Sequence, residues 1–413
     1  MNIYLISEEF PPSTGWGGIA AYSYTFAQGL LNLGHQVQVI AGVAYGKEEE
    51  NYVLGSIKVY RVKFKIYNRF LAITYFKILR RLLNFLFPIS LNHLEFSYAV
   101  YRKIKEINKD EKIDILESPE YDLGALFCIL LLKIPAVVKL HTSVRLNYVL
   151  NELKLNADVY MHDFLCRLMV RRADLVTSPS RAMLNRIAMI WGRNLPHITV
   201  FPNPIDDKMF KPGLNSFDSR FILYTGRLEK RKGVHILLDA FLKLNKNYPH
   251  IKLIMIGLDT DTFKDGKKRI FFREYMARKG IDDANRENIV LAGKLEREKL
   301  IEYYQHALFG VFPSESFDNF PYTCLEAMSC GLPMIYTSSG GAEEMMVDGK
   351  TGIAVNIKDS EGIYSAMLKM LQDRALLKQM SYNARKRVEE NYALNSRCIE
   401  AIKLYKEVIK TNA

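Results

Sequence analysis

The chain has 413 residues, 49% of them hydrophobic and 25% charged, which is the composition of a globular protein of about two domains. Its 57 lysines and arginines outnumber 45 acidic residues, for a net charge of +12, so the charge favours a polyanionic ligand such as nucleic acid, anionic lipid or a nucleotide. No zinc-finger spacing or RNP-type aromatic motif accompanies the charge, which argues against nucleic acid.

Cysteine usage indicates a reducing compartment, and the hydropathy pattern predicts no membrane-spanning segment. The five cysteines are scattered and form no Cys-x-x-Cys pair, so we expect neither disulfides nor a metal site built on thiolates. The first strand begins at residue 2 and leaves no room for a signal peptide. The longest apolar run, residues 123–132, is too short to span a bilayer. We therefore expect a cytoplasmic protein.

The N-terminal segment has the order of a βαβ unit. Residues 3–6 form an apolar strand, residues 19–33 have helical periodicity, and residues 37–41 form a second strand. Gly17 and Gly18 precede the helix, where glycines let the backbone approach an anionic group closely. A plain tight turn is the alternative. The loop lacks Gly-x-Gly-x-x-Gly, so a nicotinamide or flavin site is not indicated.

Residues 68–87 combine a basic stripe with apolar positions. Lys77, Arg80, Arg81 and Asn84 recur on one face of a helix, and most of the remaining positions are apolar. Such a helix can lie in a membrane interface with its basic face towards anionic headgroups. It can equally pack inside the domain with its charged edge in water. Both interpretations stay open. Peripheral association with the inner face of the membrane is therefore one of the alternatives.

His141 directly follows a predicted strand at residues 136–140. A side chain at the carboxyl end of a parallel strand faces the crevice where such sheets bind ligands. The alternative is a histidine whose hydrogen bonds are satisfied by local backbone. A further strand is expected at residues 173–178, with Ser180 capping the next helix.

A linker at residues 199–206 separates two halves that begin with the same pattern of strand and special turn. We predict an N-terminal Rossmann-like domain over residues 1–205 and a second over residues 206–391. An amphipathic C-terminal helix over residues 392–413 is expected to pack back across the hinge.

The second half begins with a strand at residues 221–225, followed by a turn that carries Arg227 and Lys232. A planar guanidinium and a flexible ammonium placed on one tight turn can hold a diphosphate from two sides. A solvated basic loop is the alternative. Farther on, Asp259 and Asp261 form an Asp-x-Asp that could share a divalent cation, although a plain polar loop after a strand explains it as well.

Residues 311–336 predict a strand, a polar loop, a helix and a second strand. Asp318 or Asn319 can cap the helix, with Pro321 in its first turn and Gly331 at its end. The start of such a helix directs backbone N–H groups and the positive end of its dipole at one point, which suits a phosphate. Glu326 lies about one and a half turns into the helix, where its carboxylate can accept hydrogen bonds from a ribose.

These residues resemble the donor-site motif of the retaining GT-B glycosyltransferases, glycosyltransferase family four. The resemblance rests on residues 318–321, 325–328 and 330–333, together with the Gly-Arg and Lys-Gly pairs of residues 226–233. The family motif has two Glu separated by seven residues; here Glu326 is the second, and Asp318 holds the first position. The resemblance implies an α/β protein with the GT-B fold, in which two facing Rossmann-like domains border a deep cleft.

The resemblance also implies the reaction and the roles of the residues. A sugar is transferred, with retention of anomeric configuration, from a nucleotide-diphosphate-sugar donor to the hydroxyl of a carbohydrate or lipid-linked acceptor. No metal or other cofactor is expected. A nucleotide-sugar epimerase or hydrolase of the same fold, and a non-catalytic carbohydrate-binding protein, are the alternatives. The predicted catalytic residues are Arg227, Lys232, His141 and Asp318, and the predicted donor-binding residues are Gly17, Gly18, Gly293, Lys294, Asn319, Phe320, Pro321 and Glu326.

Overall fold

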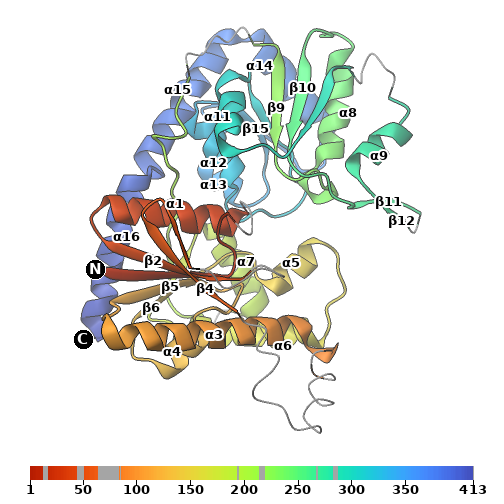
Figure 1. Cartoon of the computed structure of the whole chain (residues 1–413). Helices are drawn as coiled ribbons and strands as arrows, with labels where there is room; N and C mark the ends of the chain where they lie inside the picture. The colour runs from red at the N-terminus through yellow and green to blue at the C-terminus, as the bar shows by residue number, and fades with distance from the viewer. Residues whose placement is uncertain are drawn as a thin grey trace. The chain divides into compact units, whose positions relative to one another are not determined.

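The computed structural model describes residues 1–12, 17–43, 51–63, 83, 85–192, 195–213, 219–266, 268–281 and 287–412. The chain divides into two compact units (Figure 1). Unit 1 comprises Met1–Pro204 and Leu394–Ala413, and unit 2 comprises Ile205–Ala393. Residues 68–82 and 84 of the predicted basic amphipathic segment, and residues 13–16 of the first glycine-containing loop, lie outside the described residues.

Unit 1 is built on an eight-stranded sheet in the order β3-β4-β2-β1-β5-β6-β7-β8, in which every pairing is parallel except that of β3 with β4. The strand order reverses between β1 and β5, which are neighbours. The strands are β1 (Asn2–Ser7), β2 (Gln36–Gly42), β3 (Tyr52–Leu54), β4 (Ile57–Val62), β5 (Ile115–Pro119), β6 (Ala136–Lys139), β7 (Leu175–Ser178) and β8 (Ile198–Val200).

Helices cover both faces of this sheet, as its buried parallel strands require. The helix α1 packs against α16, while α3, α4 and α6 contact one another as a second group (Figure 1). Ser180 accepts a hydrogen bond from the Met183 N–H, so the predicted cap is confirmed. The helices are α1 (Gly18–Asn32), α3 (Pro88–Asp110), α4 (Leu126–Leu131), α5 (Val144–Leu150), α6 (Ala157–Arg172), α7 (Arg181–Trp191) and α16 (Leu394–Asn412).

The C-terminal helix α16 is fastened to unit 1 by packing and by a buried carboxylate. Gly29 of α1 lies so close to Cys398 and Leu394 of α16 that a Cβ there would be 2.4 Å from the Cys398 Sγ. The carboxylate of Glu117, on β5, accepts hydrogen bonds from the hydroxyls of Tyr22 and Tyr405. One buried acidic group therefore joins α1, β5 and α16.

Unit 2 contains a six-stranded parallel sheet in the order β13-β10-β9-β14-β15-β16 and a separate hairpin of β11 with β12. The strand order reverses between β9 and β14. The strands are β9 (Phe221–Thr225), β10 (Lys252–Ile256), β11 (Phe263–Asp265), β12 (Lys268–Ile270), β13 (Ile289–Gly293), β14 (Gly310–Phe312), β15 (Met334–Thr337) and β16 (Gly352–Val355).

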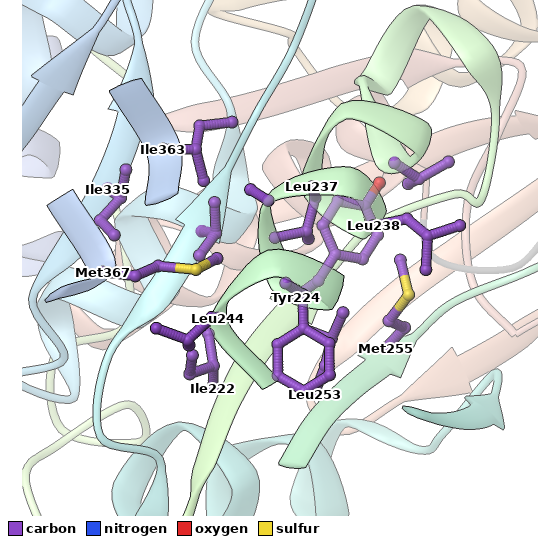
Figure 2. Close-up of a cluster of buried hydrophobic side chains, with 14 of the residues drawn as sticks. Ile222, Tyr224, Leu237, Leu238, Leu244, Leu253, Met255, Ile335, Ile363 and Met367 are labelled. Carbon is purple, nitrogen blue, oxygen red and sulfur yellow. The ribbon is translucent and has the colours of Figure 1, made fainter. Parts of the chain in front are cut away.

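The core of unit 2 lies between its sheet and the helices α8 and α14, which contact each other. Figure 2 shows Leu237, Leu238 and Leu244 of α8 among side chains from β9 and β10. Among the described helices of both units, none is long and apolar enough to cross a membrane. The helical elements of unit 2 are η1 (Lys230–Lys232), α8 (Val234–Asn245), α9 (Phe272–Arg278), α11 (Arg297–His306), α12 (Tyr322–Ser329), α13 (Gly341–Met345), α14 (Ser360–Gln372) and α15 (Arg374–Asn391).

Gly233 permits the loop after β9 to touch the loop after β14. Its φ is +69°, and a Cβ at this position would lie 1.8 Å from the carbonyl oxygen of Pro313. Gly280 has nearly the same φ, +65°, but open space around the position of a Cβ. The two glycines therefore separate the cost of the left-handed backbone from the cost of a steric clash.

We expect Gly280→Ala to lower the free energy of unfolding by about 1–2 kcal/mol, the cost of a left-handed L-residue. Gly233→Ala should lower it by clearly more, because the two loops must also move apart. Urea unfolding followed by circular dichroism measures both variants. Equal losses would contradict the close approach of the two loops.

Candidate active site

The predicted residues of unit 2, except Gly293 and Lys294, gather where the strand order of its sheet reverses. The loop of residues 226–233 follows β9, and the loop of residues 313–321 follows β14. In open parallel sheets, ligands bind at such a reversal, beyond the carboxyl ends of the strands. The two loops also contact each other directly, since the Glu315 N–H donates a hydrogen bond of 3.0 Å to the Arg231 carbonyl oxygen.

Lys232 and Asp318 form an ion pair between these loops. Their side chains are 17% and 15% exposed, so water screens the pair less than it screens a surface salt bridge. The Lys232 Nζ also lies 5.5 Å from the centre of the Phe312 ring. The ion pair therefore places the Lys232 ammonium at the reversal point, with the Asp318 carboxylate beside it.

Arg227 is the most accessible cation of the site, with 55% of its side chain exposed. The buried carboxylate of Glu229 lies 3.3 Å from the Arg227 guanidinium and 2.8 Å from the Nε of Arg231. Glu229 thus holds two guanidiniums on one short turn. Together with the Lys232–Asp318 pair, Arg227, Arg231 and Lys232 outnumber the two carboxylates with which they pair.

The start of α12 differs from the prediction. Pro321 is the N-cap residue rather than a residue of the first turn, and it makes no side-chain cap hydrogen bond. Asp318 and Asn319 are therefore not the N-cap residue of α12; Asp318 pairs with Lys232, and the Asn319 Oδ1 accepts the Phe320 N–H at 2.7 Å. The backbone of Asp318 is bound to Ser339 and Gly341 at 2.8 Å on both sides, which fixes this loop.

Glu326 lies in the interior of unit 2, with 8% of its surface exposed. Its Oε2 is 3.0 Å from the hydroxyl of Tyr304 on α11, and the same hydroxyl is 3.0 Å from the Thr225 Oγ1 at the end of β9. Burial raises the pKa of Glu326, while the positive charge of Arg297 and the Tyr304 hydroxyl oppose the rise. The site therefore contains a carboxylate that is hydrogen-bonded to α11 and linked through Tyr304 to the end of β9.

Sequence reasoning missed Tyr304, Thr225 and Glu229. Tyr304 precedes Glu326 by 22 residues, and nothing in its local sequence indicates a partner. Thr225 offered a weak signal, since it is the last residue of the strand before the Gly-Arg turn. Glu229 lies inside the motif itself but at a position that the motif leaves unspecified.

Gly293 and Lys294 lie at the end of β13, which β10 separates from β9. Both are exposed, and Gly293 has a φ of +70° while its carbonyl oxygen accepts the Gly257 N–H at 2.8 Å. They are thus on the same edge of the sheet as the cation cluster, but the strands β10 and β9 lie between β13 and β14.

The Asp-x-Asp has a structural explanation at its first residue. The carboxylate of Asp259 accepts the N–H groups of Phe272 at 2.8 Å and Arg273 at 3.2 Å, at the start of α9. Asp259 thereby satisfies backbone donors at a helix N-terminus. Within the described residues, no group of three or more His, Cys, Asp or Glu is arranged to hold a metal ion.

The remaining predicted residues, Gly17, Gly18 and His141, belong to unit 1. Gly17 is the N-cap residue of α1. His141 follows β6, its N–H donates to the Glu120 Oε2 at 2.5 Å, and its ring meets the Tyr22 ring edge-on with centroids 5.8 Å apart. Burial, with the charge of Lys139, lowers the pKa of His141 to about 3, so this imidazole is neutral at pH 7.

Two family models match the chain in succession. Residues 16–208 match the model described as Glycosyltransferase Family 4, and residues 205–387 match the model described as Glycosyl transferases group 1. A glycogen synthase of Mycobacterium tuberculosis is 27% identical over 233 residues, which cover 54% of this chain and 52% of that protein. The match therefore spans about half the length of that relative. An uncharacterized glycosyltransferase of Methanocaldococcus jannaschii is 25% identical over 428 residues, covering 98% of both chains.

Solved structures share the fold over nearly the whole chain. A sucrose-phosphate synthase from Thermosynechococcus elongatus superposes with a TM-score of 0.75 at 17% identity, covering 99% of both chains. Anabaena HepE in complex with UDP and glucose superposes with a TM-score of 0.69 at 16% identity, covering 98% of this chain and 99% of the other. The chain therefore has the GT-B fold and belongs to the family-four type of GT-B glycosyltransferases.

Proposed function

We propose that the protein transfers a sugar from a nucleotide-diphosphate-sugar donor to an acceptor hydroxyl. The observation that carries the proposal is that the cation cluster of Arg227, Arg231 and Lys232 follows β9, and that Tyr304 links the carboxylate of Glu326 to the end of the same strand. The cations suit a diphosphate, and the carboxylate suits a ribose. The solved complex of HepE with UDP and glucose is consistent with a donor of this class.

The difficult step in such a transfer is departure of a diphosphate on which negative charge grows. Arg227 and Lys232 supply positive charge that is already in place before the reaction, so little reorganisation is needed as the bond breaks. Lys232 must then share its ammonium between Asp318 and the diphosphate. Asp318 in turn can accept hydrogen bonds from hydroxyls of the donor sugar, which is its proposed second role.

We further propose retention of anomeric configuration by attack from the side of the departing diphosphate. In this mechanism a donor phosphate oxygen accepts the proton of the acceptor hydroxyl, and no enzyme carboxylate acts as nucleophile. The neutral His141 is suited to hydrogen bonding with the transferred sugar rather than to carrying charge. The acceptor is proposed to be a carbohydrate or a lipid-linked glycan, and NMR of the product's anomeric proton against that of the donor decides between retention and inversion.

Glu326→Ala should weaken binding of a nucleoside diphosphate by about 1.5–3 kcal/mol, because ribose hydroxyls lose a charged acceptor. Calorimetric titration of wild type and variant with UDP, GDP and ADP measures the loss. Glu302→Ala, which removes an exposed carboxylate from α11, is the matched control and should bind like wild type. An unchanged affinity in Glu326→Ala would remove Glu326 from the ribose site.

Arg227→Ala and Lys232→Ala should each lower kcat by roughly 10²–10³-fold, as expected when a preplaced charge that stabilises the transition state is removed. Affinity for the nucleoside without phosphates should change little, since neither cation reaches the base or ribose in this assignment. Lys230→Ala deletes an exposed cation from the same turn and controls for net charge. Equal turnover of the Arg227 and Lys230 variants would argue against the proposed role of Arg227.

We expect turnover to be metal-independent, because Arg227 and Lys232 are already placed to bind the diphosphate. Activity should therefore survive EDTA, and Asp259→Asn should keep most of the wild-type rate. Asp259→Ala should lower stability by about 1 kcal/mol, since Asp259 caps the start of α9. Loss of turnover on chelation, with recovery on adding manganese, would show that the mechanism uses a metal.

A further inference from the structure

The carboxylate of Glu326 is held by a tyrosine from a different helix. Tyr304 is 2% exposed, and its hydroxyl lies 3.0 Å from both the Glu326 Oε2 and the Thr225 Oγ1. We infer that Tyr304 is a positioning residue, which with Thr225 orients Glu326 so that the site selects ribose over deoxyribose in the nucleotide. The inference rests on the proposed function, since it concerns the donor nucleotide.

The directions of the two hydrogen bonds follow from proton counting. An ionised carboxylate only accepts hydrogen bonds, and a tyrosine hydroxyl has a single proton to donate. Tyr304 therefore donates to Glu326, and its oxygen accepts the hydroxyl proton of Thr225. Both protons are directed along one chain towards the carboxylate, which favours the ionised form that a ribose requires.

The Tyr304 ring is held in place independently of Glu326. The centroids of the Tyr304 and Phe210 rings lie 6.4 Å apart in an edge-on arrangement. The Arg297 guanidinium lies over the Phe210 ring, 4.8 Å from its centroid. Arg297 and Tyr304 are both on α11. The hydroxyl is thus presented by a packed ring rather than by a freely rotating side chain, which is the arrangement that fixes a ligand-binding carboxylate.

The hydrogen bond with Tyr304 restricts rotation of the Glu326 carboxylate but uses only part of its capacity to accept hydrogen bonds. A carboxylate has about four acceptor positions, so capacity remains for two vicinal ribose hydroxyls. A site built to accept hydroxyl protons discriminates against an analogue that lacks one, because a buried polar atom is then left unpaired. Without Tyr304 the carboxylate can turn, and this discrimination should weaken.

Tyr304→Phe keeps the packed ring and deletes only the hydroxyl. We expect this variant to bind UDP, GDP or ADP about tenfold more weakly than wild type, and to lose most of the wild-type preference for these over their 2′-deoxy and 3′-deoxy forms. Thr225→Val, which removes the donor to Tyr304, should show the same trend with a smaller loss. Tyr303→Phe, at the neighbouring and partly exposed position, is the matched control.

The pH dependence of binding separates positioning from general damage. Removing a hydrogen bond to the ionised form raises the pKa of Glu326 further, so more of it is protonated at neutral pH. Affinity of Tyr304→Phe for the ribonucleotide should therefore recover as pH rises, whereas Glu326→Gln should show no such recovery. The titratable and charged groups around Glu326 are Arg297 and Tyr304 on α11, Cys324 and Cys330 on or beside α12, and Arg385 of α15 facing Cys330.

Calorimetric titration of these variants with the paired ribo- and deoxyribonucleotides has distinct outcomes. Reduced ribose preference in Tyr304→Phe, with recovery at higher pH and an unaffected Tyr303→Phe, supports the inference. Unchanged preference in Tyr304→Phe, with wild type still selecting ribose, overturns the role of Tyr304 and leaves the proposed function intact. A wild type that binds none of the three nucleoside diphosphates overturns the proposed function together with the inference.

Discussion

The close approach of two loops in unit 2 is the constraint on which its candidate site depends. Gly233 leaves no room for a Cβ beside the Pro313 carbonyl oxygen, so the loop after β9 and the loop after β14 lie in direct contact. That contact brings Lys232 within reach of Asp318 and places Arg227 on the same turn. A parallel sheet provides the reversal point, but only a glycine at this position lets the two loops share one set of charges.

The candidate site offsets the cost of burying charge in one way for its cations and in another way for Glu326, the proposed ribose-binding carboxylate. The cations are paired, since Glu229 holds Arg227 and Arg231 while Asp318 holds Lys232. Glu326 instead relies on the hydroxyl of Tyr304 and on the charge of Arg297, which counteract the effect of burial on its pKa. Paired cations can still attract a diphosphate, because Arg227 stays half-exposed. A hydrogen-bonded carboxylate can still accept ribose hydroxyls, because its acceptor capacity is only partly used.

Features that depend on residues close together in the chain could be predicted from the sequence. The strand–helix order of both units, the cap at Ser180 and the helix stop at Gly331, whose φ is +72°, follow from short-range patterns. Features set by tertiary contacts could not be predicted. The predicted cap of α12 was wrong because the Asp318 side chain pairs with Lys232, which lies 86 residues earlier in the chain. Tyr304 was missed because its partners lie 22 and 79 residues away. A donor and its acceptor so far apart leave no spacing that a motif can record.

Both units carry ionisable groups beyond the carboxyl ends of parallel strands, but the charge of these groups differs between the units. In unit 2 the reversal between β9 and β14 carries ionised cations. In unit 1, burial raises the pKa of Glu120 to about 8 and lowers that of His141 to about 3, so Glu120 and His141 are largely neutral at pH 7. Neutral donors and acceptors suit contacts with hydroxyl groups, and fixed cations suit a phosphate on which charge develops. The charge of each group thus follows from its burial and its partners within its own unit.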